Sequence, residues 1–336
     1  MSVIGLDIGG ANLKAAHSGG AARLIRFALW KHPQRLGEQL RQLIASMPRT
    51  DLLAVTMTGE LCDCYENKRQ AVSAILDAVE AAAPGVEIRV WRNDGLLVDI
   101  QTARATSLQV AAANWLALAT YAGRLAPDGS ALVLDIGSTT IDIIPMLDGI
   151  PIPRGRTDPE RLRCQELVYS GVRRTPLCAL LGPRVAAELF ATTLDVYLAL
   201  ESIPEDVNDC DTADGRPATK ANAHARLARM RCADLETSTA EERIELARLA
   251  CHFQKMGVVR AIVQVVRDMP KLPENIVIAG SGEFLAPAII DTCLLTYPAL
   301  SSAKRLSLAT MVGIEASQAG PAYALAMLAA EQLART

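Results

Sequence analysis

Two short turns hold the residues of this chain that are best suited to bind a phosphate group. The first turn (residues 8–12) lies within LDIGGANLK and the second (residues 136–140) within LDIGSTTID, each between two apolar strands. Glycine lets the backbone approach a ligand closely, and successive N–H groups in such a turn form an anion-binding concavity. The predicted phosphate-binding residues are Gly9, Gly10, Asn12, Lys14, Gly137, Ser138, Thr139 and Thr140.

An aspartate precedes each of these phosphate turns, at Asp7 and at Asp135. A carboxylate repels a phosphate, but it can hold Mg²⁺ or the water ligands of Mg²⁺, and the metal then bridges to phosphate oxygens. The alternative is that each aspartate only caps its own turn. Because the same arrangement occurs twice, we expect a magnesium site at Asp7 and Asp135.

A third glycine turn, Gly280-Ser281-Gly282-Glu283, follows the strand predicted at residues 275–279. One Asp-x-Gly turn is common in hairpins, whereas two of them followed by a late Gly-x-Gly turn form a specific pattern. The third turn is a candidate nucleotide-like pocket, in which Glu283 would meet a ribose hydroxyl. Bulk and charge at Glu283 and Phe284 equally disfavour a nucleotide, so the binding of ATP stays open.

The elements that must position these turns are those of an α/β protein. Apolar runs predict strands at residues 3–8, 13–16, 23–30, 52–57, 87–90, 132–145 (two strands around the second turn) and 275–279. Helical spacing predicts helices at residues 34–46, 68–83, 107–121, 184–201 (in two pieces), 220–232, 240–268, 284–294 and 321–333.

The composition excludes several classes of protein. The chain has 336 residues, enough for two domains, with 50% hydrophobic residues and a net charge of −3. That balance argues against nucleic acid as a partner, because a nucleic-acid-binding protein usually carries a basic excess. No apolar run of about 18 residues predicts a membrane span, and no secretory signal is visible, so we expect a cytoplasmic protein. Dispersed cysteines, Cys62 and Cys64 among them, are expected to be free thiols.

Three segments resemble the motifs of the actin, Hsp70 and sugar-kinase (ASKHA) superfamily. LDIGGANLKAA and LDIGSTTIDII are similar to its two phosphate motifs, and IVIAGSGEFLAP to its adenosine motif. The resemblance implies two actin-like (ribonuclease H-like) α/β domains around a central cleft. Residues 1–123 with residues 320–336 would form domain I, and residues 124–319 domain II.

A closer resemblance covers nearly the whole chain. MTGELCDCYENKRQAV, LVYSGVRRTPLCAL, TADGRPAT and ARLARMRCAD are similar to the hydantoinase/oxoprolinase-like family linked to tetrahydromethanopterin-dependent one-carbon transfer. Its archaeal members are the aminomethylfuranyl-methyl phenoxy synthases of methanofuran biosynthesis. This implies a transferase that condenses an aminomethyl-furanylmethyl diphosphate with the phenol of a tyramine- or tyrosine-derived acceptor, forming an ether and releasing diphosphate. Bacteria use the analogous carrier methylofuran, so the acceptor stays open.

The resemblance changes the ligand expected at the turns, because they would hold the diphosphate of the substrate instead of ATP. The phenol has a pKa of about 10, so a base assists its attack. The candidate bases are Asp142 and Glu60. Asp7, through its expected Mg²⁺, is the third candidate catalytic residue. Asp142 lies two residues beyond Thr140, on the same face of a regular strand, and its alternative role is a hydrogen bond to nearby backbone.

Two other functions stay open at this point. An ATP-dependent small-molecule kinase of the same superfamily would bind ATP between the turns. A nucleotide switch that binds partner proteins would need a self-associating surface or an added domain. Arg173 and Arg174 are expected at the surface, with binding of an anionic substrate as the alternative. The sequence predicts no oligomeric state.

Overall fold

The structure is a computed structural model that describes residues 2–334, and its strands form two mixed β-sheets. The strands of the first sheet are β1 (Val3–Ile8), β2 (Asn12–His17), β3 (Ala22–Arg26), β4 (Leu52–Met57), β5 (Glu87–Trp91) and β6 (Leu97–Asp99). Those of the second sheet are β7 (Ser130–Ile136), β8 (Ile141–Leu147), β9 (Ile150–Pro151), β10 (Leu167–Val168), β11 (Asn275–Ala279) and β12 (Lys304–Ser307).

The two sheets share one arrangement of strands. The order is β3-β2-β1-β4-β5-β6 in the first sheet and β10-β8-β7-β11-β12 in the second, with β9 beside β8. In each sheet an antiparallel hairpin, β1–β2 or β7–β8, is followed by parallel strands, β4 and β5 or β11 and β12. The two phosphate turns connect the strands of these hairpins, so they occupy equivalent positions in the two sheets.

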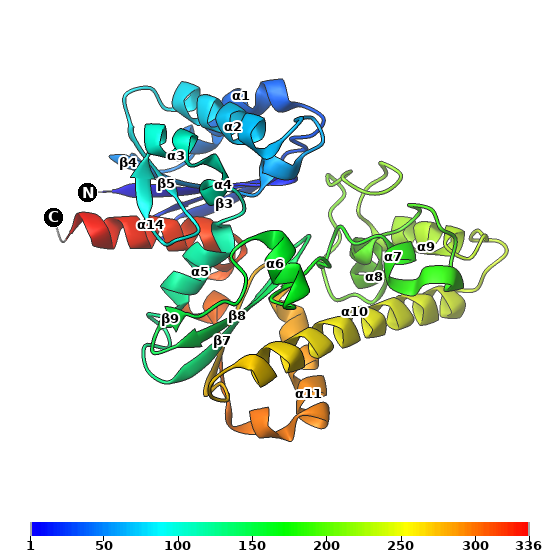
Figure 1. Ribbon diagram of the computed structural model, residues 1–336. Helices are drawn as coiled ribbons and strands as arrows, with labels where there is room; N and C mark the ends of the chain where they lie inside the picture. Colours follow the sequence, from blue (N-terminus) through cyan, green and yellow to red (C-terminus); the bar gives the residue numbers. More distant parts are fainter. Residues whose placement is uncertain (1, 335–336) are drawn as a thin grey trace.

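Helices cover both sheets (Figure 1). The helices before β7, together with the C-terminal helix, are α1 (Leu36–Ala45), α2 (Lys68–Ala82), α3 (Ile100–Ala105), α4 (Ser107–Val110), α5 (Asn114–Ala122) and α14 (Gly320–Leu333). The remaining helices are α6 (Asp158–Arg163), α7 (Leu177–Leu181), α8 (Thr193–Ala199), α9 (Lys220–Arg229), α10 (Ala240–Asp268), α11 (Ala286–Thr296), α12 (Leu308–Val312) and α13 (Ile314–Gln318). In Figure 1, α7, α8 and α9 gather at one end of the long helix α10, away from the first sheet.

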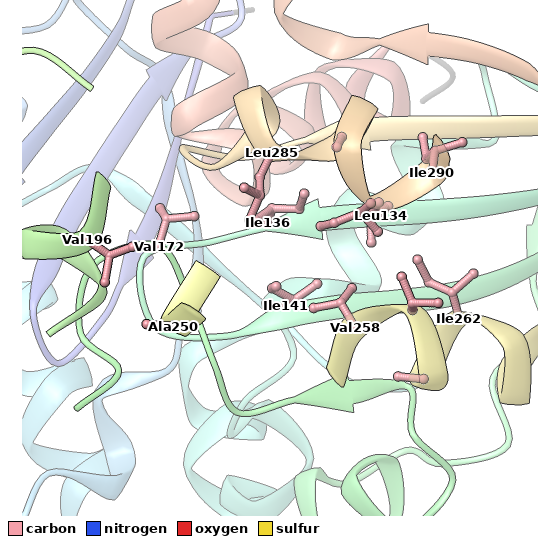
Figure 2. Close-up of a cluster of buried hydrophobic side chains, with 14 of the residues drawn as sticks. Leu134, Ile136, Ile141, Val172, Val196, Ala250, Val258, Ile262, Leu285 and Ile290 are labelled. Carbon is pink, nitrogen blue, oxygen red and sulfur yellow. The ribbon is translucent and has the colours of Figure 1, made fainter. Parts of the chain in front are cut away.

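The core of the second lobe lies on one face of the β7–β8 hairpin. Figure 2 shows Leu134, Ile136 and Ile141 of this hairpin between side chains of α10, such as Val258, and of α11, such as Ile290. These side chains are almost fully buried, and burying each one contributes about 1.5–3 kcal/mol. This packing holds the second phosphate turn on a rigid support.

The small residues of α14 allow it to pack closely against β1 and α5. A Cβ atom at Gly5 of β1 would lie 1.9 Å from the carbonyl oxygen of Ala322, so only glycine fits there. The end of α14 lies beside the N-terminal strand (Figure 1). Among residues 2–334, none of the helices combines the length and the apolarity needed to cross a membrane.

Three predicted elements are wrong in extent. The strand predicted at residues 23–30 ends at Arg26, because the following amides bond to the first phosphate turn, Phe27 to Ala11 and Leu29 to Gly10. The helix predicted at residues 107–121 is broken into α4 and α5, because Ala111 pairs with Met57 at the end of β4.

The third error is the helix predicted over residues 184–201. Only Thr193–Ala199 of that segment is α-helical. Residues 185–192 follow an irregular path whose backbone groups pair with distant segments, as in the bond from the Ala186 amide to the Met230 carbonyl. Helical spacing in the sequence does not reveal these long-range partners.

Candidate active site

A cavity of about 540 Å³ lies between the two sheets, with both phosphate turns in its wall. All of the predicted phosphate-binding residues line it, namely Gly9, Gly10, Asn12, Lys14, Gly137, Ser138, Thr139 and Thr140. The side-chain amide of Asn12 donates a hydrogen bond to Ser138 Oγ at 3.3 Å, which places the two turns directly opposite each other. The structure therefore brings together two turns that lie 126 residues apart in the sequence.

The two turns close in the same way. The Gly9 amide donates to the Asn12 carbonyl at 3.0 Å, and the Gly137 amide donates to the Thr140 carbonyl at 2.9 Å. A Cβ atom at Gly137 would approach the Thr140 carbonyl oxygen to 2.9 Å, so the tight turn requires glycine there. Such turns direct backbone N–H groups toward one point, where an anion binds.

The aspartates before the turns lie in the same cavity but have different partners across their hairpins. Asp7 is opposite Lys14, with the ammonium 3.5 Å from the carboxylate, whereas Asp135 is opposite Asp142. Burial raises the pKa of Asp7, and Lys14 opposes this increase. Burial, and then the charge of Asp142, raise the pKa of Asp135 from 3.8 to about 7. The second hairpin thus places two carboxyl groups opposite each other, whereas in the first hairpin a carboxylate is opposite an ammonium.

Mg²⁺ fits this donor set if the other ligands come from water and substrate. Asp7 Oδ1 is buried and has no hydrogen-bond partner, so it is available to a cation. Within residues 2–334, no group of three or more His, Cys, Asp or Glu side chains is close enough to hold a metal. Mg²⁺ is commonly bound by one or two carboxylates together with waters and phosphate oxygens, which is what Asp7 and Asp135 offer.

Asp142 lines the cavity and forms a buried ion pair. Arg161 Nη2 donates to Asp142 Oδ1 at 2.8 Å and to the Glu166 carbonyl at 3.0 Å. The Arg161 side chain is 1% exposed, and its guanidinium lies 4.1 Å from the ring centroid of Trp115. The arginine therefore fixes the orientation of the Asp142 carboxylate.

Glu60 is placed differently from the prediction, because it is not in the wall of the cavity. Its side chain is 1% exposed, and its carboxylate lies 3.6 Å from the Lys68 ammonium. Burial raises the pKa of Glu60. Glu60 lies in the 3₁₀ turn at Gly59–Leu61, which follows β4, and it is buried there.

The third glycine turn is also absent from the cavity wall. A Cβ atom at Gly280 would lie 2.3 Å from Asp135 Oδ1, and one at Gly282 would lie 2.4 Å from Ile136 Cγ2. Glu283 accepts hydrogen bonds from the hydroxyls of Ser307 and Ser317. The turn therefore packs its two glycines against β7, and its carboxylate is bound by two serine hydroxyls. It is formed by Gly280, Ser281, Gly282 and Glu283.

Several wall residues were not identified from the sequence: Trp30, Asn114, Trp115, Asp158, Arg161 and Tyr169. One signal was available, since Thr157 and Glu160 form a capping box that starts the short helix carrying Asp158 and Arg161. Cys62 lines the cavity as well, and burial raises the pKa of its thiol to about 11. Trp30 and Trp115 carry no local motif that distinguishes them from core aromatics, whereas Tyr169 lies in the family-like segment LVYSGVRRTPLCAL.

Known proteins match this chain over most of its length. The hydantoinase/oxoprolinase family matches residues 51–310. The chain is 32% identical over 342 residues to the (4-{4-[2-(gamma-L-glutamylamino)ethyl]phenoxymethyl}furan-2-yl)methanamine synthase of Methanocaldococcus jannaschii, with 98% of each chain covered. It is 34% identical over 215 residues to the protein of the same name from Methanococcus vannielii, covering 61% of this chain and 93% of that one.

A likeness to a solved structure concerns the fold alone. The nucleotide-free structure of acetone carboxylase is 10% identical, with a TM-score of 0.55, covering 96% of this chain and 70% of that chain. Together with the two equivalent sheets, this confirms the predicted fold class, two actin-like α/β domains around a central cleft.

Proposed function

The chain belongs to the hydantoinase/oxoprolinase family, and from that premise we propose that it is the ether-forming transferase of methanofuran or methylofuran biosynthesis. It condenses an aminomethyl-furanylmethyl diphosphate with a tyramine- or tyrosine-derived phenol. The two archaeal relatives are synthases of a phenoxymethyl-furan methanamine, and the ether in that name is the bond formed here. We place the enzyme in the cytoplasm and its product in tetrahydromethanopterin-linked one-carbon metabolism.

The observation that carries the proposal is the meeting of both phosphate turns in one cavity. A diphosphate has two phosphoryl groups, and each hairpin offers one anion-binding turn to it. Lys14 lines the same cavity and adds a positive charge. The remaining volume, within a cavity of about 540 Å³, leaves room for a furan and a phenol beside the diphosphate.

In the reaction, the bond between the furanylmethyl carbon and the diphosphate oxygen breaks, and the diphosphate leaves with the electron pair. The ring oxygen of the furan stabilises the positive charge that develops on this carbon. Donors of the two turns and Lys14 stabilise the charge on the leaving group, where preorganised groups act most strongly. When bound at Asp7 and Asp135, Mg²⁺ supplies additional charge neutralisation.

The phenol oxygen then forms the new C–O bond and loses its proton. Asp142 is the base that this structure supports, because it lines the cavity and Arg161 orients its carboxylate. Asp142 is preferred to Glu60, because Glu60 is not among the residues that line the cavity. A positioned base contributes about 10²- to 10⁴-fold to such a step.

The test is a reaction of the purified protein with a synthetic aminomethyl-furanylmethyl diphosphate and a phenolic acceptor, with Mg²⁺ or with a chelator. Mass spectrometry follows the ether, and a phosphate assay coupled to pyrophosphatase follows diphosphate. We expect one diphosphate per ether and a fall in kcat of about 100-fold in Asp142→Asn, with Asp128→Asn, an exposed acid, as the matched control. Transfer of phosphate from ATP to the acceptor, with no ether formed, would show the chain to be a kinase instead.

A further inference from the structure

The cavity opens to solvent beside a group of aromatic and basic side chains that the reaction above does not use. Tyr169 and Leu61 of the wall are 61% and 56% exposed, whereas Asp7 at the turns is 3% exposed. Trp30 and Arg174 line the same cavity and are partly exposed. The guanidinium carbon of Arg174 lies 4.6 Å from the ring centroid of Trp30, so a planar cation is held against an aromatic face.

Arg174 is held in place through the second phosphate turn. Its backbone amide donates to the Ser138 carbonyl at 3.0 Å, and the Val172 amide donates to the Gly137 carbonyl at the same distance. Gly171 allows this contact, because a Cβ atom there would lie 2.4 Å from Thr139 N. The Arg174 side chain therefore starts from a rigid support at the edge of the diphosphate site.

The charges in the wall leave Arg174 available for a ligand. Among the described residues, three cationic side chains line the cavity: Lys14, Arg161 and Arg174. Lys14 pairs with Asp7, and Arg161 with Asp142, within the wall itself. The carboxylate partner of Arg174 is Asp211, which is outside the wall, 40% exposed and 3.7 Å away, a distance too long for a direct hydrogen bond.

The geometry of the acceptor directs its tail toward this opening. In the product named for the relatives, the phenol carries its tail at ring position 4, opposite the oxygen that forms the ether. With the oxygen at Asp142, we expect the tail to extend away from the reacting carbon and toward the exposed residues of the wall. A guanidinium is well suited to bind a carboxylate there, because its fork forms two parallel hydrogen bonds.

We propose that Arg174, stacked on Trp30, binds a carboxylate on the tail of the phenolic acceptor and so selects anionic phenols over tyramine itself. The inference rests on the proposed function, since it assigns a specificity determinant within that site. The class of acceptor is thereby narrowed to phenols that carry a carboxylate, whether on a γ-glutamyl group or on a tyrosine.

The test measures acceptor binding by calorimetry in the presence of Mg²⁺ and diphosphate. The acceptors are γ-glutamyltyramine and L-tyrosine, which carry a carboxylate, and tyramine, which lacks it. We expect Arg174→Gln to weaken binding of the preferred anionic acceptor by about 10- to 100-fold and to leave tyramine unchanged. Arg174→Lys should show an intermediate loss, because lysine keeps the charge but not the fork.

The matched control is Arg184→Gln, which removes another arginine stacked on an aromatic ring, that of Phe253 at 5.0 Å, outside the cavity wall. It should leave the binding of every acceptor unchanged. Equal weakening of tyramine and of the anionic acceptors in Arg174→Gln would overturn the inference, and so would weaker binding of diphosphate. If the wild-type protein shows the expected binding pattern but forms no ether, the proposed function fails while the assignment of Arg174 stands.

Discussion

Replacing Asp135 by asparagine should stabilise the folded protein, and more so at neutral than at acidic pH. Burial and the nearby charge of Asp142 raise the pKa of Asp135 to about 7. Between about pH 4 and pH 7 the carboxyl of the unfolded chain loses its proton while that of the folded protein keeps it. Stability is therefore lost as pH rises through this window, and it levels off above the folded pKa. Asparagine has no such dependence.

The magnitude follows from the size of the shift. An increase from 3.8 to about 7 corresponds to about 4 kcal/mol at 1.36 kcal/mol per unit. Asp135 is partly exposed in the cavity, so solvent screening reduces this to about 2 kcal/mol. With an unfolding entropy of about 2.1 cal/mol/K per residue over 336 residues, about 2 kcal/mol corresponds to about 3 °C in Tm.

The assay is thermal unfolding of wild type and Asp135→Asn in a chelator, at pH 5 and at pH 7.5. The Tm advantage of the variant should be about 2 °C larger at pH 7.5. Asp128→Asn, on the exposed turn before β7, should show no pH-dependent advantage. Mg²⁺ should then raise the Tm of wild type more than that of Asp135→Asn, because ligand binding stabilises the folded state. A Tm advantage that stays constant or shrinks from pH 5 to pH 7.5 would refute the reasoning.

Two further substitutions test the support of the site. Gly171→Ala should displace the second phosphate turn, since the new Cβ would lie 2.4 Å from the backbone of that turn, and kcat/KM should fall about 100-fold. The control is Gly257→Ala, where the added Cβ meets nothing within 4 Å. This variant should stabilise α10 by about 1 kcal/mol. Arg161→Met should leave the charge of Asp142 unpaired and destabilise the protein by about 3 kcal/mol in denaturant unfolding. Arg163→Met, at an exposed position, should change stability by less than about 0.5 kcal/mol, and a similar loss in both variants would contradict the role of the buried pair.

Elements with a strong local pattern were predicted well from the sequence. The helix predicted at residues 240–268 has the same bounds as α10, and the strand predicted at residues 275–279 has those of β11. α10 also starts at a capping box formed by Thr239 and Glu242, a signal that is local to the sequence. Where a segment pairs with distant backbone, as residues 185–192 do, its own apolar spacing is misleading.

In the candidate site, too, the features with a local sequence pattern were predicted, and those set by long-range contacts were not. The sequence determined the two phosphate turns, because a tight turn that presents N–H groups depends on glycines and on flanking apolar strands, and both are local properties. The fold class was also predicted, through the resemblance of the three glycine motifs to those of the actin, Hsp70 and sugar-kinase superfamily.

Only the tertiary structure decided which side chains meet in the cavity. Asp142 pairs with Arg161, Arg174 stacks on Trp30 from the segment after β3, and Glu60 is not among the residues that line the cavity. Each outcome depends on how two packed lobes bring together segments that are far apart in the chain. Propensity and periodicity describe a segment and its immediate neighbours, whereas the partners of a buried charge are set by the packing of the whole core.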